Sequence, residues 1–374
     1  MRNRWFIALA AIGLHISIGS VYAWSVLTRP IMADMGFTLS QTTWTFSLAI
    51  LMLGLSAGFL GSFAEKIGPK KSGLLAMLFW VTGLLGTAYA LSIHNLTLLY
   101  LTLVKYFPNR PGFATGLAIM GFGFASLIAG PLMQFLVAQF GLVNNFIILG
   151  VIYLVIMGAS SLYLKAPQQK HSTRTTKDKS TMYVHTHGML ANDAMKTWQF
   201  GALWWVFFIN ITCGIGLLSL ASPMAQEAIG MTPTAAASLV GIIGIFNGGG
   251  RIAWSTISDY LGRAKTYILF FIIEIVAFYL LAQTNSALTF QILILLIITC
   301  YGGGFSCMPA YLADLYGIRQ LSTIHGRILT AWGLAGITGP MLVSYFHEAG
   351  YGYTTALECF AALFVLNTII AILT

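Results

Sequence analysis

The amino-acid sequence predicts an all-α polytopic membrane protein. Of its 374 residues, 57% are apolar and only 8% are charged, whereas a soluble globular domain has about 25% charged residues. Most of the chain falls into apolar runs of about 20 residues, the length that an α-helix needs to cross roughly 30 Å of hydrocarbon. These observations exclude a soluble enzyme and a soluble nucleic-acid-binding protein, and they name the lipid bilayer as a partner.

Eleven apolar runs with few charges predict about eleven full spans. They cover residues 5 to 27, 44 to 64, 72 to 93, 112 to 138, 145 to 164, 199 to 220, 234 to 258, 266 to 284, 287 to 312, 326 to 346 and 354 to 374. The first run is longer than the apolar core of a signal peptide, so we interpret it as a spanning helix. The polar, basic stretch from Lys165 to Trp198 predicts a flexible linker. The chain therefore divides into an N-terminal helical half at 1–164, a linker at 165–198 and a C-terminal six-helix half at 199–374.

The positive residues indicate how the helices are oriented. If a twelfth, shortened span lies between Ser92 and Pro111, 17 of the 19 lysines and arginines fall on one side of the membrane. Arg29 falls on the other side, and Arg251 lies within a helix. Such a bias follows the positive-inside rule. We therefore expect a multi-pass protein of the cell inner (plasma) membrane with the linker and both termini in the cytoplasm.

A short loop motif occurs once in each half. Glu65 and Asp259 are 194 positions apart, and so are Gly68 and Gly262. A repeated spacing of this kind indicates two pseudo-symmetric halves. The motif residues are Gly61, Glu65, Lys66, Gly68, Lys70, Asp259, Gly262 and Arg263.

The fourth span of the first half is too short to cross a membrane. Leu96 to Val104 provides nine apolar residues, which make about 13.5 Å of helix. Without a crossing here, Lys105 and Arg110 would lie outside, against the charge pattern, so we interpret the gap as an internal deletion. We expect the segment to be short or partly extended, shielded by helices 2, 3 and 5, and we expect transport to be impaired.

Two six-helix halves, a basic linker and the glycine loop after helices 2 and 8 together resemble the major facilitator superfamily. Finer motifs are similar to its branch of oxalate/formate antiporters and bacterial monocarboxylate transporters. These motifs are Gly19-Ser-Val-Tyr22-Ala-Trp24-Ser25, Lys105-Tyr-Phe-Pro-Asn-Arg-Pro-Gly112, Asn247-Gly-Gly-Gly-Arg251 and Cys300-Tyr301-Gly-Gly-Gly-Phe305. The resemblance implies a transporter of small organic anions. It also implies that the loop motifs form charge-paired latches at the cytoplasmic ends of helices; the alternative is that they only set topology.

Arg251 is the sharpest candidate for a substrate contact. A guanidinium in the middle of a spanning helix costs about 2.5 to 3.5 kcal/mol, so it usually faces a cavity or a partner. Its fork of donors suits a carboxylate, and Asn247 lies one turn earlier on the same face. The resemblance also points to Asn247 and Arg251 as substrate contacts. The alternative is a structural ion pair between Arg251 and Glu274 or Glu358.

Three further residues are candidates for substrate binding. Tyr301 precedes a triple glycine and can donate its hydroxyl to the same carboxylate, although a packing or interfacial tyrosine also fits. His15 and Tyr22 lie two turns apart on one face of the first helix, where either can bind substrate or relay a proton. For His15, the alternative is a hydrogen-bonded structural role in the bundle.

The sequence shows no pattern typical of catalysis or of a cofactor or metal site. The four cysteines form no CxxC pair, and no nucleotide loop, catalytic carboxylate pair or cluster with metal-ligand spacing is found. We therefore predict a monomeric secondary transporter, not an enzyme, which moves monocarboxylates of the lactate, pyruvate or formate type by alternating access. Its partners are the small organic anion and, as a candidate, a proton.

Two alternatives remain from the sequence. One is a transport-impaired remnant or sensor of the same fold, and the other is an oxalate/formate-type anion exchanger. Helix 11 reads Thr330-Ala-Trp332 where the oxalate-exchanging relative has a lysine, and this difference favours a substrate with one carboxylate.

Overall fold

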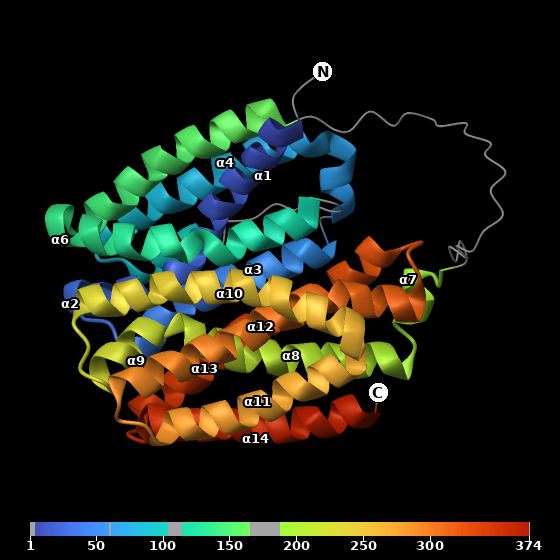
Figure 1. Cartoon of the computed structure of the whole chain (residues 1–374). Helices are drawn as coiled ribbons and strands as arrows, with labels where there is room; N and C mark the ends of the chain where they lie inside the picture. The colour runs from blue at the N-terminus through green and yellow to red at the C-terminus, as the bar shows by residue number, and fades with distance from the viewer. Residues whose placement is uncertain (1–3, 60, 104–113, 165–187, 374) are drawn as a thin grey trace.

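The computed structural model describes residues 4–59, 61–103, 114–164 and 188–373, and within these ranges the chain forms helices and turns but no strand. Figure 1 shows long helices that lie side by side in a bundle, with most of those before the linker above those after it. The prediction of an all-α protein is confirmed. Residues 165–187 of the predicted linker lie outside the described residues.

The first span is bent. Helix α1 (Arg4–Gly19), the 3-10 helix η1 (Ser20–Ala23) and α2 (Ser25–Met35) follow one another, and the axis turns by 53° where α2 begins. Pro30 lies inside α2, where it has no N–H to bond the carbonyl one turn earlier. All four residues of η1 are buried, so the bend carries Tyr22 into the interior of the bundle.

Glycines break two long helical stretches. Helix α3 (Leu39–Phe59) precedes α4 (Gly61–Ser92), which is interrupted at Gly68, and α6 (Ala114–Tyr163) is interrupted at Gly141. The backbone angles are φ 79° and ψ 165° at Gly68 and φ 83° and ψ 169° at Gly141, a region that essentially only glycine adopts. In Figure 1 the two parts of α6 run in opposite directions from the turn that joins them. Gly141 thus separates the two apolar runs predicted at 112–138 and 145–164.

The shortened fourth span is a short helix. Helix α5 (Leu96–Leu103) has 8 residues, which corresponds to about 12 Å at 1.5 Å per residue. It packs against α3 and α4, the second and third predicted helices, and Leu99 is buried. For these residues, the expectation of a short segment shielded by the second and third helices is met, and shielding by the fifth helix stays a prediction. Val104, Lys105 and Arg110 lie outside the described part of the chain.

The second half follows the predicted runs closely. Its elements are α8 (Trp198–Ser219), α9 (Ala221–Glu227), α10 (Pro233–Leu261), α11 (Arg263–Gln283), α12 (Ala287–Tyr316), α13 (Leu321–Glu348) and α14 (Gly352–Leu373). The short helix α7 (Ala191–Ala194) precedes them, within the predicted linker. The side chains of Thr197, Thr232 and Ser286 accept backbone N–H groups in the first turns of α8, α10 and α12. Such N-caps satisfy donors that have no partner within the helix, so local sequence fixes where these spans begin.

Within the described residues, eight helices are long and apolar enough to cross a membrane, and the bent α1–α2 pair makes a ninth. This count takes the two parts of α6 as one stretch. The predicted number of eleven full spans therefore stays a prediction.

Two pairs of helices make the most extensive contacts between the first half and the second. Helix α3 packs along α13, and α6 packs along α10. A Cβ on Gly54 would lie 2.4 Å from the Cα of Gly333, and one on Gly130 would lie 3.1 Å from the carbonyl oxygen of Ala237. Small residues at such crossings allow close backbone approach in membrane proteins. Glycines therefore set how closely the two halves meet.

The two loop glycines share an unusual backbone conformation. Gly262, between α10 and α11, has φ 90° and ψ 150°, close to the angles of Gly68, which lies 194 positions earlier. The sequence repeat is therefore also a repeat of local backbone geometry at this position. The pseudo-symmetry of the complete halves remains a prediction.

Candidate anion-binding site

Arg251 lies inside the bundle without an acidic partner. It is in the middle of α10, and only 5% of its surface is exposed. No ion pair between described residues includes it. Glu274 instead contacts Asn210, and Glu358 contacts Gln283, so the alternative of a structural ion pair with either acid is not found.

Asn247 orients the guanidinium of Arg251. Its Oδ1 accepts a hydrogen bond from Arg251 Nε at 3.2 Å, as the spacing of one helical turn predicts. The Nδ2 of Asn247 is buried and has no hydrogen-bond partner. A Cβ on Gly302 would lie 2.4 Å from the backbone oxygen of Asn247, so the triple glycine of α12 is what allows that helix to reach this point.

Two tyrosines, one from each half of the chain, lie beside Arg251. The hydroxyls of Tyr22 in η1 and Tyr301 in α12 are 3.2 Å apart, and both side chains are almost completely buried. Both hydroxyls lie within electrostatic range of the Arg251 guanidinium, and Tyr22 also forms a side-chain contact with it. Tyr22, Asn247, Arg251 and Tyr301, four of the five predicted substrate-binding residues, therefore form one cluster.

Aromatic rings form one side of this cluster. The Arg251 guanidinium carbon lies 5.2 Å from the centroid of the Phe305 ring, a cation–π arrangement. Phe207 and Trp332 both pack edge-on against Phe305, with centroid distances of 5.1 and 5.4 Å. Phe305 was not among the residues predicted for the site. Its signal is its position one turn after Tyr301 on the same helical face.

His15 is held by its own helix. Its Nδ1 lies 2.7 Å from the carbonyl oxygen of Ala11, one turn earlier in α1. The contacts that join the other four residues do not include His15. A role for His15 in binding or proton relay thus stays a prediction without support from those contacts.

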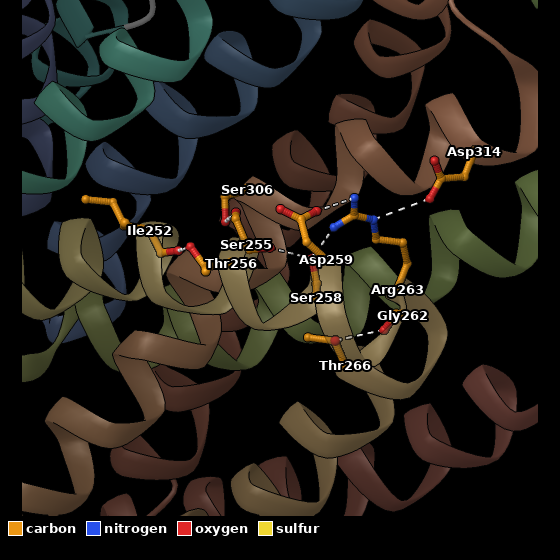
Figure 2. Close-up of polar contacts among 10 residues, drawn as sticks. All are labelled: Ile252, Ser255, Thr256, Ser258, Asp259, Gly262, Arg263, Thr266, Ser306 and Asp314. Carbon is orange, nitrogen blue, oxygen red and sulfur yellow. Dashed lines mark hydrogen bonds and ion pairs between the residues drawn. The ribbon is translucent and has the colours of Figure 1, made fainter. Parts of the chain in front are cut away.

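The loop motif of the second half forms a charged cluster at the end of α10 (Figure 2). Arg263 binds Asp259 through Nη2 at 2.6 Å and Asp314 of α12 through Nε at 3.3 Å, and it donates a further hydrogen bond to Ser258. The sequence predicted the Asp259–Arg263 pair but missed Asp314. In the first half, the side chains of Gly61 to Lys66 lie outside the described residues.

A chain of serines connects this cluster to Arg251. Ser306 of α12 donates to the backbone oxygen of Arg251 at 2.9 Å, and Ser255 donates to Ser306 at 2.7 Å. Ser258 donates to the backbone oxygen of Ser255 at 2.9 Å and accepts from Arg263 (Figure 2). Hydrogen bonds therefore run from the candidate site to the loop motif along the α10–α12 contact.

At the other end of α10, polar contacts join the two halves. Arg29 of α2 lies 3.8 Å from Glu227 of α9 and donates to Gln226 at 3.0 Å. Glu227 also accepts from Tyr353 and contacts His347. Nearby, Ser40 of α3 donates through its backbone N–H and its hydroxyl to Glu348, in both cases at 2.7 Å. Sequence reasoning missed this network, because its members are scattered along the chain.

Comparison with known proteins agrees with the fold. The family model described as Major Facilitator Superfamily matches residues 100–263 and 203–374. The chain is 28% identical to the uncharacterized MFS-type transporter YhjX of Escherichia coli (strain K12), over 90% of this chain and 86% of that protein. It is 25% identical to the oxalate:formate antiporter of Oxalobacter formigenes, over 95% of this chain and 87% of that protein.

Two further comparisons are also with transporters. A segment that makes up 40% of this chain is 27% identical to human monocarboxylate transporter 14 and covers 33% of that protein. Among solved structures, a bacterial homologue of the human lysosomal transporter Spinster, in an inward-facing and occupied conformation, aligns with a TM-score of 0.75 at 13% identity. This alignment covers 100% of this chain and 97% of the other, and at that identity it shows the fold alone.

Proposed function

The chain belongs to the Major Facilitator Superfamily, and we propose that it moves small monocarboxylates of the lactate, pyruvate or formate type by alternating access. Membership of this family, together with its transporter relatives, makes the chain a multi-pass membrane transporter rather than an enzyme. The finer statement, which anion it carries, rests on the cluster around Arg251.

One observation carries the proposal: Arg251 is buried, and no described acid pairs with it. Its guanidinium has five N–H donors, of which Nε is directed at Asn247. The unpartnered Nδ2 of Asn247 and the hydroxyls of Tyr22 and Tyr301 add donors beside it. A carboxylate is the group that such a set of donors suits, and it would supply the missing negative charge.

The position of the cluster suits alternating access. Tyr22 belongs to the first half, whereas Asn247, Arg251 and Tyr301 belong to the second. A relative movement of the halves that separates the two tyrosine hydroxyls would open the cluster, and a bound carboxylate would bridge them again. Transporters of this type commonly bind substrate near the bilayer midplane, between their repeats.

The proposal includes the arrangement in the membrane. The bent α1–α2 pair, α3, the second part of α4, the two parts of α6, α8 and α10 to α14 supply eleven spans, with α5 as the shortened fourth helix. The boundaries at 164 and 198, two pseudo-symmetric halves and cytoplasmic termini are supported by the sequence repeat and the charge pattern, and the inner membrane is supported by the bacterial relatives. A monomeric state is part of the proposal.

The first test replaces the central cation. We expect Arg251→Gln to fold in the membrane but to bind lactate or formate at least about 30-fold more weakly, because losing one partner of a buried charge pair costs about 2 to 5 kcal/mol. Arg251→Lys should recover binding only in part, since an ammonium lacks the planar fork. Binding is measured by calorimetry on purified protein, with Arg319→Gln on an exposed turn as the control. Unchanged affinity in Arg251→Gln would show that the site is elsewhere.

An oxalate exchanger is the second candidate, because one relative is named an oxalate:formate antiporter. The cluster holds one arginine, and the ring of Trp332 packs nearby against Phe305. A second carboxylate would have to lose its hydration without a matching cation, which is costly in an apolar interior. We therefore expect lactate and formate to compete for binding more strongly than oxalate does. Stronger competition by oxalate would favour the exchanger.

The short α5 supports a further expectation, that transport is impaired. The eight described residues of α5 are too few to span the hydrocarbon, and from the sequence we infer that one side of the first half lacks most of a helix. Inserting about 15 apolar residues after Thr102 completes a span and should increase lactate uptake in proteoliposomes. An insertion of equal length made of glycine and serine is the control. If uptake by the native chain already equals that of the apolar insertion, and Lys105→Cys and Thr173→Cys both label from the cytoplasm, impairment is excluded.

A further inference from the structure

A second buried ionisable residue lies outside the cluster around Arg251. Glu274 is in the middle of α11, and its side chain is fully buried. None of the ion pairs between described residues includes it. An ionisable residue inside a membrane protein is by default a candidate for function, because the bundle must compensate for its cost.

Within the described part of the chain, the hydrogen-bond partner of Glu274 is an amide. Asn210 of α8, also fully buried, donates through Nδ2 to Glu274 Oε2 at 3.2 Å. Glu274 Oε1 and Asn210 Oδ1 are both buried and have no hydrogen-bond partner. Two acceptor oxygens therefore lie unused on two side chains that already touch. A proton on Oε1 would convert one of them into a donor and give the other a partner.

Among the described residues, no cation is found that balances a negative charge on Glu274. The described titratable groups that face Glu274 are the thiols of Cys213 on α8 and Cys300 on α12. On its own helix, Phe271 and Phe278 lie about one turn before and after it, and both pack against Phe364 of α14. An apolar wall with two thiols disfavours a bare carboxylate and accommodates a neutral carboxylic acid.

Helix α12 contacts the Glu274–Asn210 pair and also carries Tyr301 of the Arg251 cluster. A Cβ on Gly304 would lie 2.5 Å from Asn210 Oδ1, and one on Gly214 would lie 2.2 Å from the Tyr301 ring. Asn210 and Gly214 are one turn apart on α8, and Tyr301 and Gly304 are about one turn apart on α12. A shift of α12 that moves Tyr301 therefore also changes the contact that α12 makes with Asn210.

We propose that Glu274 and Asn210 form a proton-binding site that couples proton movement to anion movement. The carboxylate takes up one proton from water on one side of the membrane and releases it to water on the other, so that a monocarboxylate and a proton cross together without net charge. The amide of Asn210 holds the acid by donating from Nδ2 and accepting at Oδ1. This inference rests on the proposed function for its coupling, but the proton site itself can be measured without any substrate.

The test compares three full-length proteins in proteoliposomes: wild type, Glu274→Gln and Glu358→Gln. Glu358 is the matched control, because it lies on α14 with its carboxylate bonded to Gln283 at an exposed position. Glutamine at 274 has the shape of the protonated acid, so lactate counterflow between equal pH values should persist in Glu274→Gln. Accumulation of lactate driven by a pH gradient should be lost in Glu274→Gln and retained in Glu358→Gln. Retention in Glu274→Gln would overturn the coupling, and so would a sodium gradient that replaces the proton gradient in the wild type.

Infrared difference spectroscopy on the wild-type protein without substrate decides the proton site by itself. We expect a C=O stretching band of a protonated carboxylic acid at neutral pH, absent in Glu274→Gln, present in Glu358→Gln and displaced in Asn210→Leu, where the acid loses its amide partner. Absence of this band from the wild type would overturn the proposal. If the band is present but the purified wild type binds neither lactate nor formate, the proton site stands and the monocarboxylate assignment fails.

Discussion

The structure depends on keeping one guanidinium charged inside an apolar bundle. Arg251 is surrounded by an asparagine, two tyrosines and a phenylalanine rather than by an acid. These groups lower the cost of burial through hydrogen bonds and a cation–π contact, but they do not neutralise the charge. Under the proposed function, such a site would be stable when empty and would still gain from a bound carboxylate, which is what a transporter that must bind and release an anion requires.

Close helix packing is the condition for that arrangement. Asn247 reaches its position only because Gly302 lets α12 approach α10, and Tyr301 fits only because α8 has a glycine at 214. The same α10–α12 contact carries the serine chain from Arg251 to the loop motif, which ends at Arg263. Packed helices and hydrogen bonds therefore connect the Arg251 cluster to the charged loop. At the opposite end, the Arg29 and Glu227 contacts hold the two halves together.

Much of the site could be predicted from residue types and helical spacing. A mid-helix arginine with an asparagine one turn earlier defines a face, and the structure confirms the hydrogen bond between them. Spacing does not reveal which helices are neighbours, so the contact between Tyr22 and Tyr301 and the role of Asp314 needed the tertiary structure. The same reason explains why Glu274 was first considered as a partner of Arg251, whereas it belongs to a separate pair with Asn210. The breaks at Gly68 and Gly262 follow from local sequence, because glycine alone tolerates their backbone angles.

The most direct measurement is a crystal structure of the full chain with lactate, compared with one without it. We predict that the lactate carboxylate lies between the Arg251 guanidinium and Asn247 Nδ2, within hydrogen-bond distance of the Tyr22 and Tyr301 hydroxyls. Lactate bound elsewhere in the bundle, with the Arg251 cluster unchanged and without an anion, would contradict this prediction.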